Sequence, residues 1–382
     1  MTPNARKTLI YIVTEDWYFW SHRLALARAA RAAGWDVVVA TRVQAHGERI
    51  VAEGFRLVPL PWRRGGGGTW RELLTLVRIY RLFRRERPAL VHLIALKGIV
   101  YGGLAARLAR CRARVSTVAG LGYVFTSKSW RARLMRPVLL RALAWAMGGR
   151  GSLVTVQNPD DRRLLAETGT VAAARMTLIC GSGVDVDRFA PAPEPDGLPV
   201  VGVACRMVRD KGVDCVVEAA RLLRAAGVAI RFHFAGALDP ENRDAHSRAE
   251  VESWVAEGLI EWNGPVQDVP GFWRACHIAA YPSIYGEGVP KTALEAAACG
   301  KPLVTTDMPG CRETVTDGVS GFLVPPSDPR AVADKLRLLA EDVPLRRRMG
   351  VAARAKALAE FADARIVAET LAVYERALNY PL

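Results

Sequence analysis

A short apolar run, a helical pattern and a second apolar run follow one another in each half of this chain. The runs are residues 7–14 and 35–41 in the first half, and residues 199–205 and 229–236 in the second. Strands that are apolar without alternation are buried on both faces, which is typical of parallel sheets connected by helices. We therefore predict an α/β chain with two Rossmann-like domains, whose parallel sheets face a cleft between the domains.

Five further apolar runs of strand length extend the two predicted sheets: residues 90–95, 114–119, 152–157, 278–283 and 302–306. The domain boundary is expected in a proline-rich segment that lacks periodicity. This divides the chain into a first domain at 1–188, a linker at 189–199, a second domain at 200–361 and a last helical stretch at 362–382. No apolar run of strand length follows that stretch, so we expect it to cross back to the first domain.

The composition excludes several classes of protein. Hydrophobic residues make up 51% of the chain, which is too many for intrinsic disorder. No stretch reaches the roughly 18 to 20 apolar residues that a membrane span needs, and Glu15 and Asp16 end the first apolar run, so we expect neither a signal peptide nor an integral membrane protein. The seven cysteines lack zinc or redox spacing, which favours reduced thiols and a cytoplasmic protein.

The positive charge is concentrated in the first half. The formal net charge is +15, and residues 1–190 contain 31 basic and 12 acidic residues, against 22 and 26 in the remainder. Such a half attracts nucleic acid, an anionic membrane or a pyrophosphate-bearing lipid. Aromatic residues between the arginines favour an interfacial surface, and no helix-turn-helix, RRM or zinc pattern occurs, so we expect a membrane surface and no nucleic acid as partner. A solvated basic face is the alternative.

Residues 285–329 contain the most informative chemical pattern. Gly288 allows the backbone to approach a ligand closely, and a helix is expected from Lys291 onward. The amides of Gly288 and Val289 would then lie beside the positive end of that helix, which is a ready phosphate site.

Four charged side chains complete this pattern. Glu295 lies in the expected helix, where its carboxylate can accept two ribose hydroxyls, and Glu287 in the loop can accept hydroxyls of a sugar. Arg206 and Lys211 lie in the loop after the first strand of the second half, and both can point at one diphosphate. The alternatives are a surface glutamate with a helix-capping glutamate, and an exposed basic loop.

The two glutamates with seven residues between them, together with the arginine–lysine loop, resemble the GT-4 family of retaining glycosyltransferases, which have the GT-B fold. Further segments, among them YGGLAARLA, GLGYVFTS, QNPDD and GSGVDVDRF, are similar to bacterial enzymes of capsule, O-antigen and undecaprenyl-diphosphate-glycan biosynthesis. That group includes the transferase that adds GalNAc to undecaprenyl-diphospho-bacillosamine. The likeness covers nearly the whole chain.

The resemblance implies a role for each residue of the pattern. Arg206 and Lys211 would hold the pyrophosphate of a nucleotide-sugar donor, Glu295 its ribose and Glu287 the transferred sugar, so Arg206, Lys211 and Glu287 are the catalytic candidates. The base would lie near residues 264–267, which include Val266. The implied mechanism is front-face transfer with retention, in which the leaving phosphate takes the acceptor proton. No cofactor is expected, because the nucleotide-sugar is a substrate. No metal is expected either, including at Asp185-Val-Asp187, because GT-B relatives do not use such a motif to bind a metal ion.

Candidate acceptor residues follow three predicted strands of the first half. They are Glu15, Asp16 and His22 in the bulky loop 15–23, His92 and Lys97 just past the next strand end, and Gly120 and Tyr123 after the third. Many family members carry a histidine in this third loop, and residues 117–123 contain none. Packing is the alternative for the aromatic loop, and a structural role is the alternative for His92.

These features together predict a glycosyltransferase on the cytoplasmic face of the plasma membrane. It would move a hexose or N-acetylhexosamine from a nucleotide-sugar, with UDP favoured by the resemblance, to a lipid-diphosphate-linked glycan. A GT-B enzyme with a soluble acceptor and a nucleotide-sugar epimerase are the alternatives.

Overall fold

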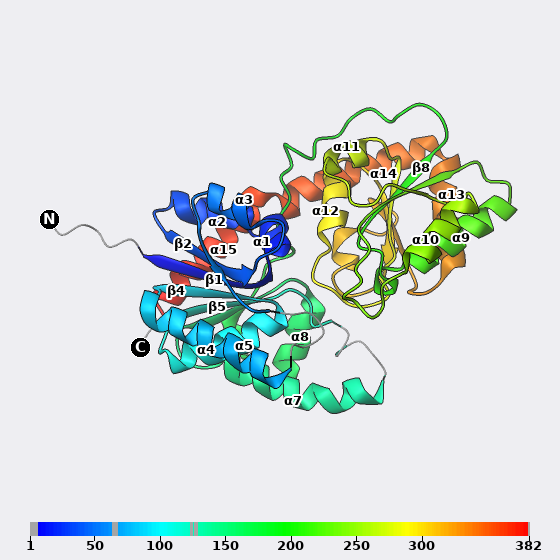
Figure 1. Cartoon of the computed structure of the whole chain (residues 1–382). Coiled ribbons are helices and arrows are strands. Elements are labelled where there is room, and N and C mark those ends of the chain that lie inside the picture. Colours follow the sequence, from blue (N-terminus) through cyan, green and yellow to red (C-terminus); the bar gives the residue numbers. More distant parts are fainter. Residues whose placement is uncertain (1–6, 63–67, 123–124, 126–128, 381–382) are drawn as a thin grey trace. The chain divides into compact units, whose positions relative to one another are not determined.

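The computed structural model describes residues 7–62, 68–122, 125 and 129–380, and the chain forms two compact units (Figure 1). The first unit is Met1–Ser182 together with Asp363–Leu382, and the second is Gly183–Ala362. Each unit contains one sheet with helices on both faces, so the predicted α/β class with two Rossmann-like domains is confirmed.

The sheet of the first unit has seven strands in the order β3-β2-β1-β4-β5-β6-β7, and all neighbouring strands run parallel. The strands are β1 (Thr8–Glu15), β2 (Asp36–Arg42), β3 (Arg56–Pro59), β4 (Leu90–Ile94), β5 (Ala113–Val118), β6 (Ser152–Val156) and β7 (Met176–Leu178). Alternate residues of β1 enter two different cores: Ile10 and Ile12 pack on one face of the sheet, and Leu9 and Tyr11 on the other.

The helices of the first unit cover both faces of this sheet. They are α1 (Asp16–His22), α2 (Leu24–Ala32), α3 (Gly47–Ala52), α4 (Thr69–Glu86), α5 (Ala95–Leu108), α7 (Trp130–Met147), α8 (Pro159–Glu167) and α15 (Asp363–Leu378), with a 3₁₀ turn at Ala173–Arg175. Figure 1 shows α4, α5 and α7 on one side of the strands, and α1, α2 and α15 on the other. The last helix of the chain therefore belongs to the core of the first unit.

The sheet of the second unit has six parallel strands in the order β10-β9-β8-β11-β12-β13. Its strands are β8 (Val200–Ala204), β9 (Arg231–Ala235), β10 (Glu261–Trp262), β11 (Ile278–Tyr281), β12 (Leu303–Thr306) and β13 (Gly321–Val324). Its helices are α9 (Val213–Ala225), α10 (Arg248–Ala256), α11 (Val269–Arg274), α12 (Lys291–Ala298), α13 (Pro329–Glu341) and α14 (Val343–Lys356), with shorter turns at Arg209–Lys211, Arg312–Thr314 and Ala357–Phe361. The largest part of its core lies between the sheet and α9, α10, α13 and α14, and buried residues of α11 and α12 add to it.

The chain passes from the first unit to the second at Ser182–Gly183, ahead of the predicted linker at 189–199. The segment after this point is fixed to the second unit by specific bonds. Arg354 donates to the carbonyl oxygens of Val186 and Phe189, and Arg346 pairs with Glu194 at 2.8 Å. A proline-rich composition therefore marks an irregular segment here, but one that side chains of α14 hold in place.

Residues 15–23 were predicted as a loop, and this prediction is wrong, because residues 16–22 form the helix α1. Phe19 on this helix packs edge-on against Tyr11 and Phe55, at 5.7 and 6.0 Å between ring centroids. The next helix, α2, begins at Leu24, since Arg23 leaves the helical conformation with φ −128° and ψ −6°. Burial of an aromatic face explains why this segment is helical.

Within the residues described, no helix combines the length and the apolar character that crossing a bilayer demands.

Candidate active site

Three loops of the second unit meet at the carboxyl edge of its sheet. They follow β8, β11 and β12, which are neighbours in the sheet order. Because parallel strands end at the same edge, the side chains on these loops converge, and this edge is where ligands of open α/β sheets bind. The predicted donor residues Arg206, Lys211 and Glu287 all lie on the first two of these loops.

Hydrogen bonds and a close glycine contact join the loops after β8 and β11. The carbonyl oxygen of Asp210 accepts from the backbone nitrogen of Ile284 at 3.0 Å and from the hydroxyl of Ser283 at 2.9 Å. Gly212 has φ +75°, and a Cβ built there would lie 2.0 Å from the carbonyl oxygen of Pro282. Only glycine fits a position with this conformation and this approach, so it holds Lys211 close to the second loop.

Lys211 and Glu287 form an ion pair across this junction. The Lys211 Nζ lies 2.6 Å from the Glu287 Oε2, with side chains that are 14% and 20% exposed. Glu287 also accepts from the hydroxyl of Ser283 at 2.6 Å and from the hydroxyl of Tyr281 at 2.9 Å. The carboxylate is therefore held by one cation and two hydroxyl groups from neighbouring positions.

The charges within this pair offset the cost of burial. Burial by itself raises the pKa of Glu287, but the Lys211 ammonium and the two hydroxyl donors outweigh burial and bring the pKa below its ordinary value. Burial likewise lowers the pKa of Lys211, and the carboxylates of Glu287 and Asp210 more than reverse this. Both groups are therefore charged at neutral pH.

Arg206 has its own carboxylate partner. Its Nη1 donates to Asp239, which follows β9, and the Arg206 side chain remains 35% exposed. A guanidinium has five N–H donors, so a contact through one nitrogen leaves a donor face for a second anion. The structure thus places both predicted cations at one edge, each oriented by an acid.

The loop of Gly288 and Val289 rests on the loop after β12. The backbone nitrogen of Glu287 donates to the carbonyl oxygen of Pro309 at 2.9 Å, and a Cβ on Gly310 would lie 1.9 Å from the carbonyl oxygen of Gly288. Within the described parts of the chain, the amides of Gly288 and Val289 donate to no protein acceptor. They precede α12, whose N-terminal end favours an anion.

Glu295 lies in the second turn of α12 and differs from Glu287 in having no fixed partner. Its carboxylate makes no hydrogen bond or ion pair with the residues that the structure describes. Burial raises its pKa to about 7, and the charges of Lys291 and Arg188 only partly offset this. A carboxylate in these surroundings gains from hydroxyl donors, which is what a ribose supplies.

Val266, the candidate near the base, is half-buried in the loop between β10 and α11. The carbonyl oxygen of Gly264 in the same loop accepts from the backbone nitrogen of Gly236 at 2.8 Å. This bond attaches the loop to the end of β9, at the same edge of the sheet as Arg206. Base recognition by Val266 stays a prediction.

The acidic candidates of the first unit are both buried at the end of β1. Asp16 accepts from the backbone nitrogens of Gln44 and His46 at 2.6 and 2.9 Å, and Glu15 lies 3.7 Å from Arg42. Asp16 therefore holds the loop after β2 to the start of α1, which is a structural use of its oxygens.

His22 and Lys97 lie nearer the surface. The Nδ1 of His22 lies 2.6 Å from the hydroxyl of Ser21, and its ring stacks on Tyr18 at 4.0 Å between centroids. Lys97, in the first turn of α5, donates to Glu72 at 2.8 Å. Their contact with an acceptor stays a prediction.

His92 was expected just past a strand end, and this placement is wrong, because His92 lies in the middle of β4 and is wholly buried. Its Nδ1 lies 2.6 Å from the Tyr374 hydroxyl and its Nε2 lies 2.6 Å from the Thr117 Oγ1. Burial and then the charge of Arg23 hold the pKa of His92 well below its ordinary value. Both ring nitrogens thus link β4 to α15 and β5, and neither reaches a ligand.

The third candidate loop follows β5. Gly120 and Gly122 both have positive φ, +89° and +66°, so the chain turns sharply there. Tyr123 lies outside the described residues. An acceptor contact at this loop stays a prediction.

Other predicted features of the sequence have local structural roles. Asn158 caps α8 by accepting from the backbone nitrogen of Asp161, and the acids Asp160 and Asp161 lie in the first turn of this helix. Asp185 accepts from the backbone nitrogens of Asp187 and Arg188, which closes a turn.

Sequence reasoning missed Asp239, Tyr281 and Ser283. Tyr281 and Ser283 lie in the run predicted as a strand, where they read as core residues, and Asp239 lies in a loop without a motif. The available signal was that Ser283 lies between a strand end and a glycine-rich loop.

Comparisons with known proteins identify the family of each half of the chain. Residues 8–158 match the family described as glycosyl transferase 4-like, and residues 198–342 match glycosyl transferases group 1. The chain is 24% identical to the N,N'-diacetylbacillosaminyl-diphospho-undecaprenol alpha-1,3-N-acetylgalactosaminyltransferase of Campylobacter jejuni, over 94% of this chain and 95% of that protein. It is 23% identical to the capsular polysaccharide biosynthesis glycosyltransferase CapM of Staphylococcus aureus, over 81% and 82%. The crystal structure of Anabaena HepE in complex with UDP and glucose matches with a TM-score of 0.77 and 21% identity, over 96% and 99% of the two chains.

Proposed function

Because the chain belongs to the GT-4-like glycosyltransferases of the GT-B fold, we propose that it moves a hexose or N-acetylhexosamine from a UDP-sugar to a lipid-diphosphate-linked glycan, with retention. The arrangement of Arg206, Lys211 and the Gly288–Val289 amides at one sheet edge carries this proposal. These groups are cationic or hydrogen-bond donors, and they suit a diphosphate whose negative charge grows as the sugar leaves.

The carboxylate partners do not prevent this role for the cations. An ammonium group has three N–H donors, and the contact with Glu287 uses one, so Lys211 can donate two more to diphosphate oxygens. Asp239 fixes Arg206 in the same way. Carboxylates that orient the cations lower the cost of ordering long side chains when the donor binds.

Glu295 is suited to the donor ribose and Glu287 to the transferred sugar. Glu295 is ionised in part at neutral pH, and its carboxylate oxygens can accept hydrogen bonds from ribose hydroxyl groups. Glu287 already accepts from Lys211, Ser283 and Tyr281, which use most of its acceptor capacity. We infer that Glu287 acts mainly by orienting Lys211, with one further contact to a sugar hydroxyl.

The reaction follows from these roles. The bond between the sugar and the β-phosphate breaks, the acceptor oxygen attacks from the same face, and the leaving phosphate oxygen takes the acceptor proton. Arg206, Lys211 and the helix end neutralise the departing diphosphate, so we propose transfer without a metal ion. Addition of EDTA should leave the initial rate unchanged within about twofold.

The lipid-linked acceptor is supported by two observations. The name of the Campylobacter jejuni relative describes an undecaprenol diphosphate substrate. The first half of this chain also carries the basic excess, and α7 exposes Trp130, Leu134 and Val138 at four-residue intervals. Such a helix suits the interface of an anionic membrane, so we propose a peripheral enzyme on the inner face of the plasma membrane.

A donor panel measured by nucleotide release tests this function, with undecaprenyl-diphosphate sugars and matched soluble sugars as acceptors. We expect release from a UDP-sugar that depends on the lipid-linked acceptor. Equal rates with soluble acceptors would replace the lipid by a soluble substrate. Donor conversion without any acceptor, detected as a new sugar epimer, would favour an epimerase and contradict the proposal.

A further inference from the structure

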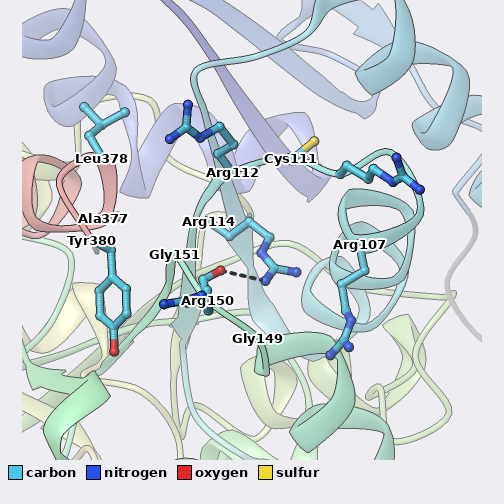
Figure 2. Close-up of a pocket in the computed structure, with 11 residues that line it drawn as sticks. Arg107, Cys111, Arg112, Arg114, Gly149, Arg150, Gly151, Ala377, Leu378 and Tyr380 are labelled. Atoms are coloured by element: carbon cyan, nitrogen blue, oxygen red, sulfur yellow. Dashed lines mark hydrogen bonds between the residues drawn. The ribbon is translucent and has the colours of Figure 1, made fainter. Parts of the chain in front are cut away.

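The amino-terminal edge of the first sheet contains a pocket of about 260 Å³ (Figure 2). It lies at the loops that enter β5 and β6, beside the last residues of α15. Five arginines line it: Arg107, Arg110, Arg112, Arg114 and Arg150. A neighbouring pocket of about 430 Å³ shares Arg110 and Arg112 and adds two more arginines, Arg84 and Arg87. Among the residues described, no acidic side chain lines either pocket.

Arg114 is the buried member of this cluster, with only 4% of its surface exposed. Its Nη2 donates to the carbonyl oxygens of Gly148 and Arg150 at 2.9 and 3.2 Å. Its Nε and Nη1 are buried and have no partner among the described residues. In Figure 2 its guanidinium lies at the centre of the pocket, among the other arginines. Buried donors without acceptors cost free energy, so this arrangement calls for a ligand.

Helix capping explains part of this cluster. Arg107 donates to the carbonyl oxygen of Trp145 at 2.8 Å, near the end of α7, and the carbonyl groups at helix ends attract cations. These carbonyls carry partial charges, whereas each guanidinium carries a full one. They also leave two nitrogens of Arg114 unpaired. Capping therefore accounts for some of the donors and leaves the charge of the cluster uncompensated.

Two glycines keep the wall of the pocket thin. Gly149 has φ +86°, and a Cβ there would lie 2.9 Å from the Arg114 Nη2. Gly151 has φ +68°, and a Cβ there would lie 2.0 Å from the carbonyl oxygen of Arg112. A side chain at position 149 would crowd the Arg114 guanidinium and one at position 151 would clash with the backbone of Arg112, so glycine at both positions lets the loop pass close to the pocket.

We propose that this pocket binds a phosphate or diphosphate group, with Arg114 as its buried contact and Arg112 and Arg150 at its mouth. Planar guanidinium groups bind phosphate oxygens with paired hydrogen bonds, and the pocket offers several such forks within one small volume. The site belongs to the first unit, so it is separate from the donor loops of the second, and it goes beyond the proposed function. The same chemistry fits a free diphosphate or the headgroup of an anionic lipid.

The lipid source has one additional argument. Trp145 is exposed on α7, and the guanidinium of Arg107 lies 4.2 Å from the centre of its ring. An arginine over an exposed tryptophan next to a phosphate pocket is an arrangement that suits a headgroup with its acyl chains nearby.

The first experiment titrates the full chain with inorganic pyrophosphate by calorimetry, in an Arg206→Ala background that weakens the donor loops. The test variant is Arg112→Gln with Arg150→Gln, and the control is Arg162→Gln with Arg163→Gln on α8. All four residues are exposed and both pairs remove the same charge from the same unit. If the ligand is a free diphosphate, the test variant should bind pyrophosphate at least 10-fold more weakly than the Arg206→Ala background, and the control should bind it within twofold of that background.

The second experiment locates the ligand. Cys111 lines the pocket and Cys180 does not, and both are half-buried thiols of the first unit. Peptide mass spectrometry after alkylation should show that pyrophosphate slows modification of Cys111 at least threefold and leaves Cys180 unchanged. Arg114→Met should abolish both binding and protection. If that buried variant does not fold, as judged by circular dichroism, the comparison of the exposed test variant with its control still tests the proposal.

The third experiment uses flotation with vesicles of phosphatidylcholine, with and without phosphatidylglycerol. If the headgroup is the ligand, the wild-type chain floats with phosphatidylglycerol and the test variant loses at least fivefold more binding than the control. The inference is overturned if the test and control variants behave alike with both pyrophosphate and vesicles, since net charge alone then explains binding. None of these measurements requires transferase activity, so their failure is distinguishable from failure of the proposed function.

Discussion

The Nζ of Lys211 lies 2.6 Å from the Oε2 of Glu287, although the two residues come from loops that are 76 positions apart in the chain. The pair is largely buried, and it joins the strand ends of β8 and β11. One salt bridge thus holds two loops together and, in the function proposed above, also orients a cation toward the donor diphosphate. These tasks are separable by substitution.

Lys211→Met should lower both stability and turnover. Removing one partner of a buried pair leaves the other charge uncompensated, so we expect a loss of about 3 kcal/mol in the free energy of unfolding. Loss of the cation should also reduce kcat by about 100- to 1,000-fold, by analogy with single donors to a developing anion. Urea unfolding and initial rates at saturating donor measure the two effects.

The double variant Lys211→Met with Glu287→Gln separates the two tasks. It removes both charges, so stability should recover by at least half while turnover stays low. Arg231→Met is the surface control, because Arg231 pairs with Glu261 while both side chains remain exposed, and such a pair contributes at most about 1 kcal/mol. Recovery of activity in the double variant would contradict the role of Lys211 at the diphosphate.

Arg206→Ala should weaken donor binding much more than Arg209→Ala in the same loop. The Arg206 guanidinium is fixed by Asp239 at the carboxyl edge, whereas Arg209 pairs with Asp214 and Glu250 on the surface. We expect the donor KM to rise or kcat/KM to fall by about 30- to 1,000-fold for Arg206→Ala, and to change by less than threefold for Arg209→Ala. Arg206→Lys should restore only part of the lost kcat/KM, because an ammonium group lacks the forked geometry of a guanidinium. Equal effects of the two alanine variants would place the diphosphate elsewhere.

The sequence was sufficient to predict the inner strands of both sheets, but it did not predict the strands at their edges. Its nine predicted strands all occur, within one or two residues at most ends. The four that it did not predict, β3, β7, β10 and β13, are the outermost strands of the two sheets. These edge strands have only two to four residues each. The residues of β3 and β10 are also exposed or half-buried, so their sequences contain no long apolar run that would indicate a buried strand.

The candidate site divides along similar lines. The convergence of Arg206, Lys211 and Glu287 was predictable, because parallel strands bring loops after neighbouring strands to one edge. The roles given to these residues and to Glu295 came from the family resemblance and stay predictions. The sequence did not predict which of these side chains pair, because the contact between Lys211 and Glu287 depends on side-chain packing between two loops. His92 shows the same limit, since its fate depends on Tyr374, which is 282 positions away.

Donor binding should depend on pH through Glu295. Its pKa is raised to about 7 by burial, and a ribose hydroxyl donates a stronger hydrogen bond to the ionised carboxylate than to the protonated carboxyl group. The donor KM should therefore fall as pH rises from 6 to 8, and Glu295→Gln should bind weakly with no such dependence. Stability runs the other way: the folded chain holds the proton more tightly than the unfolded chain, so this contribution is present at low pH and declines as pH rises toward about 7. A donor KM that is flat between pH 6 and 8 in the wild-type chain would contradict this role.

His92 should prove to be a residue of stability and not of acceptor binding. Its pKa lies well below the ordinary value of 6.5, so the folded chain excludes a proton that the unfolded chain binds, and stability should decline as pH falls below about 6.5. Tyr374→Phe removes the hydroxyl partner of a wholly buried ring and should cost about 1–3 kcal/mol in the free energy of unfolding. His92→Gln should likewise lower the melting temperature, and a double-mutant cycle should show that the two losses are not additive, because the side chains share one bond.

At temperatures where both variants are folded, the acceptor KM should stay within twofold of wild type. A rise of tenfold or more in the acceptor KM for His92→Gln, with Tyr374→Phe unchanged, would return His92 to the acceptor site.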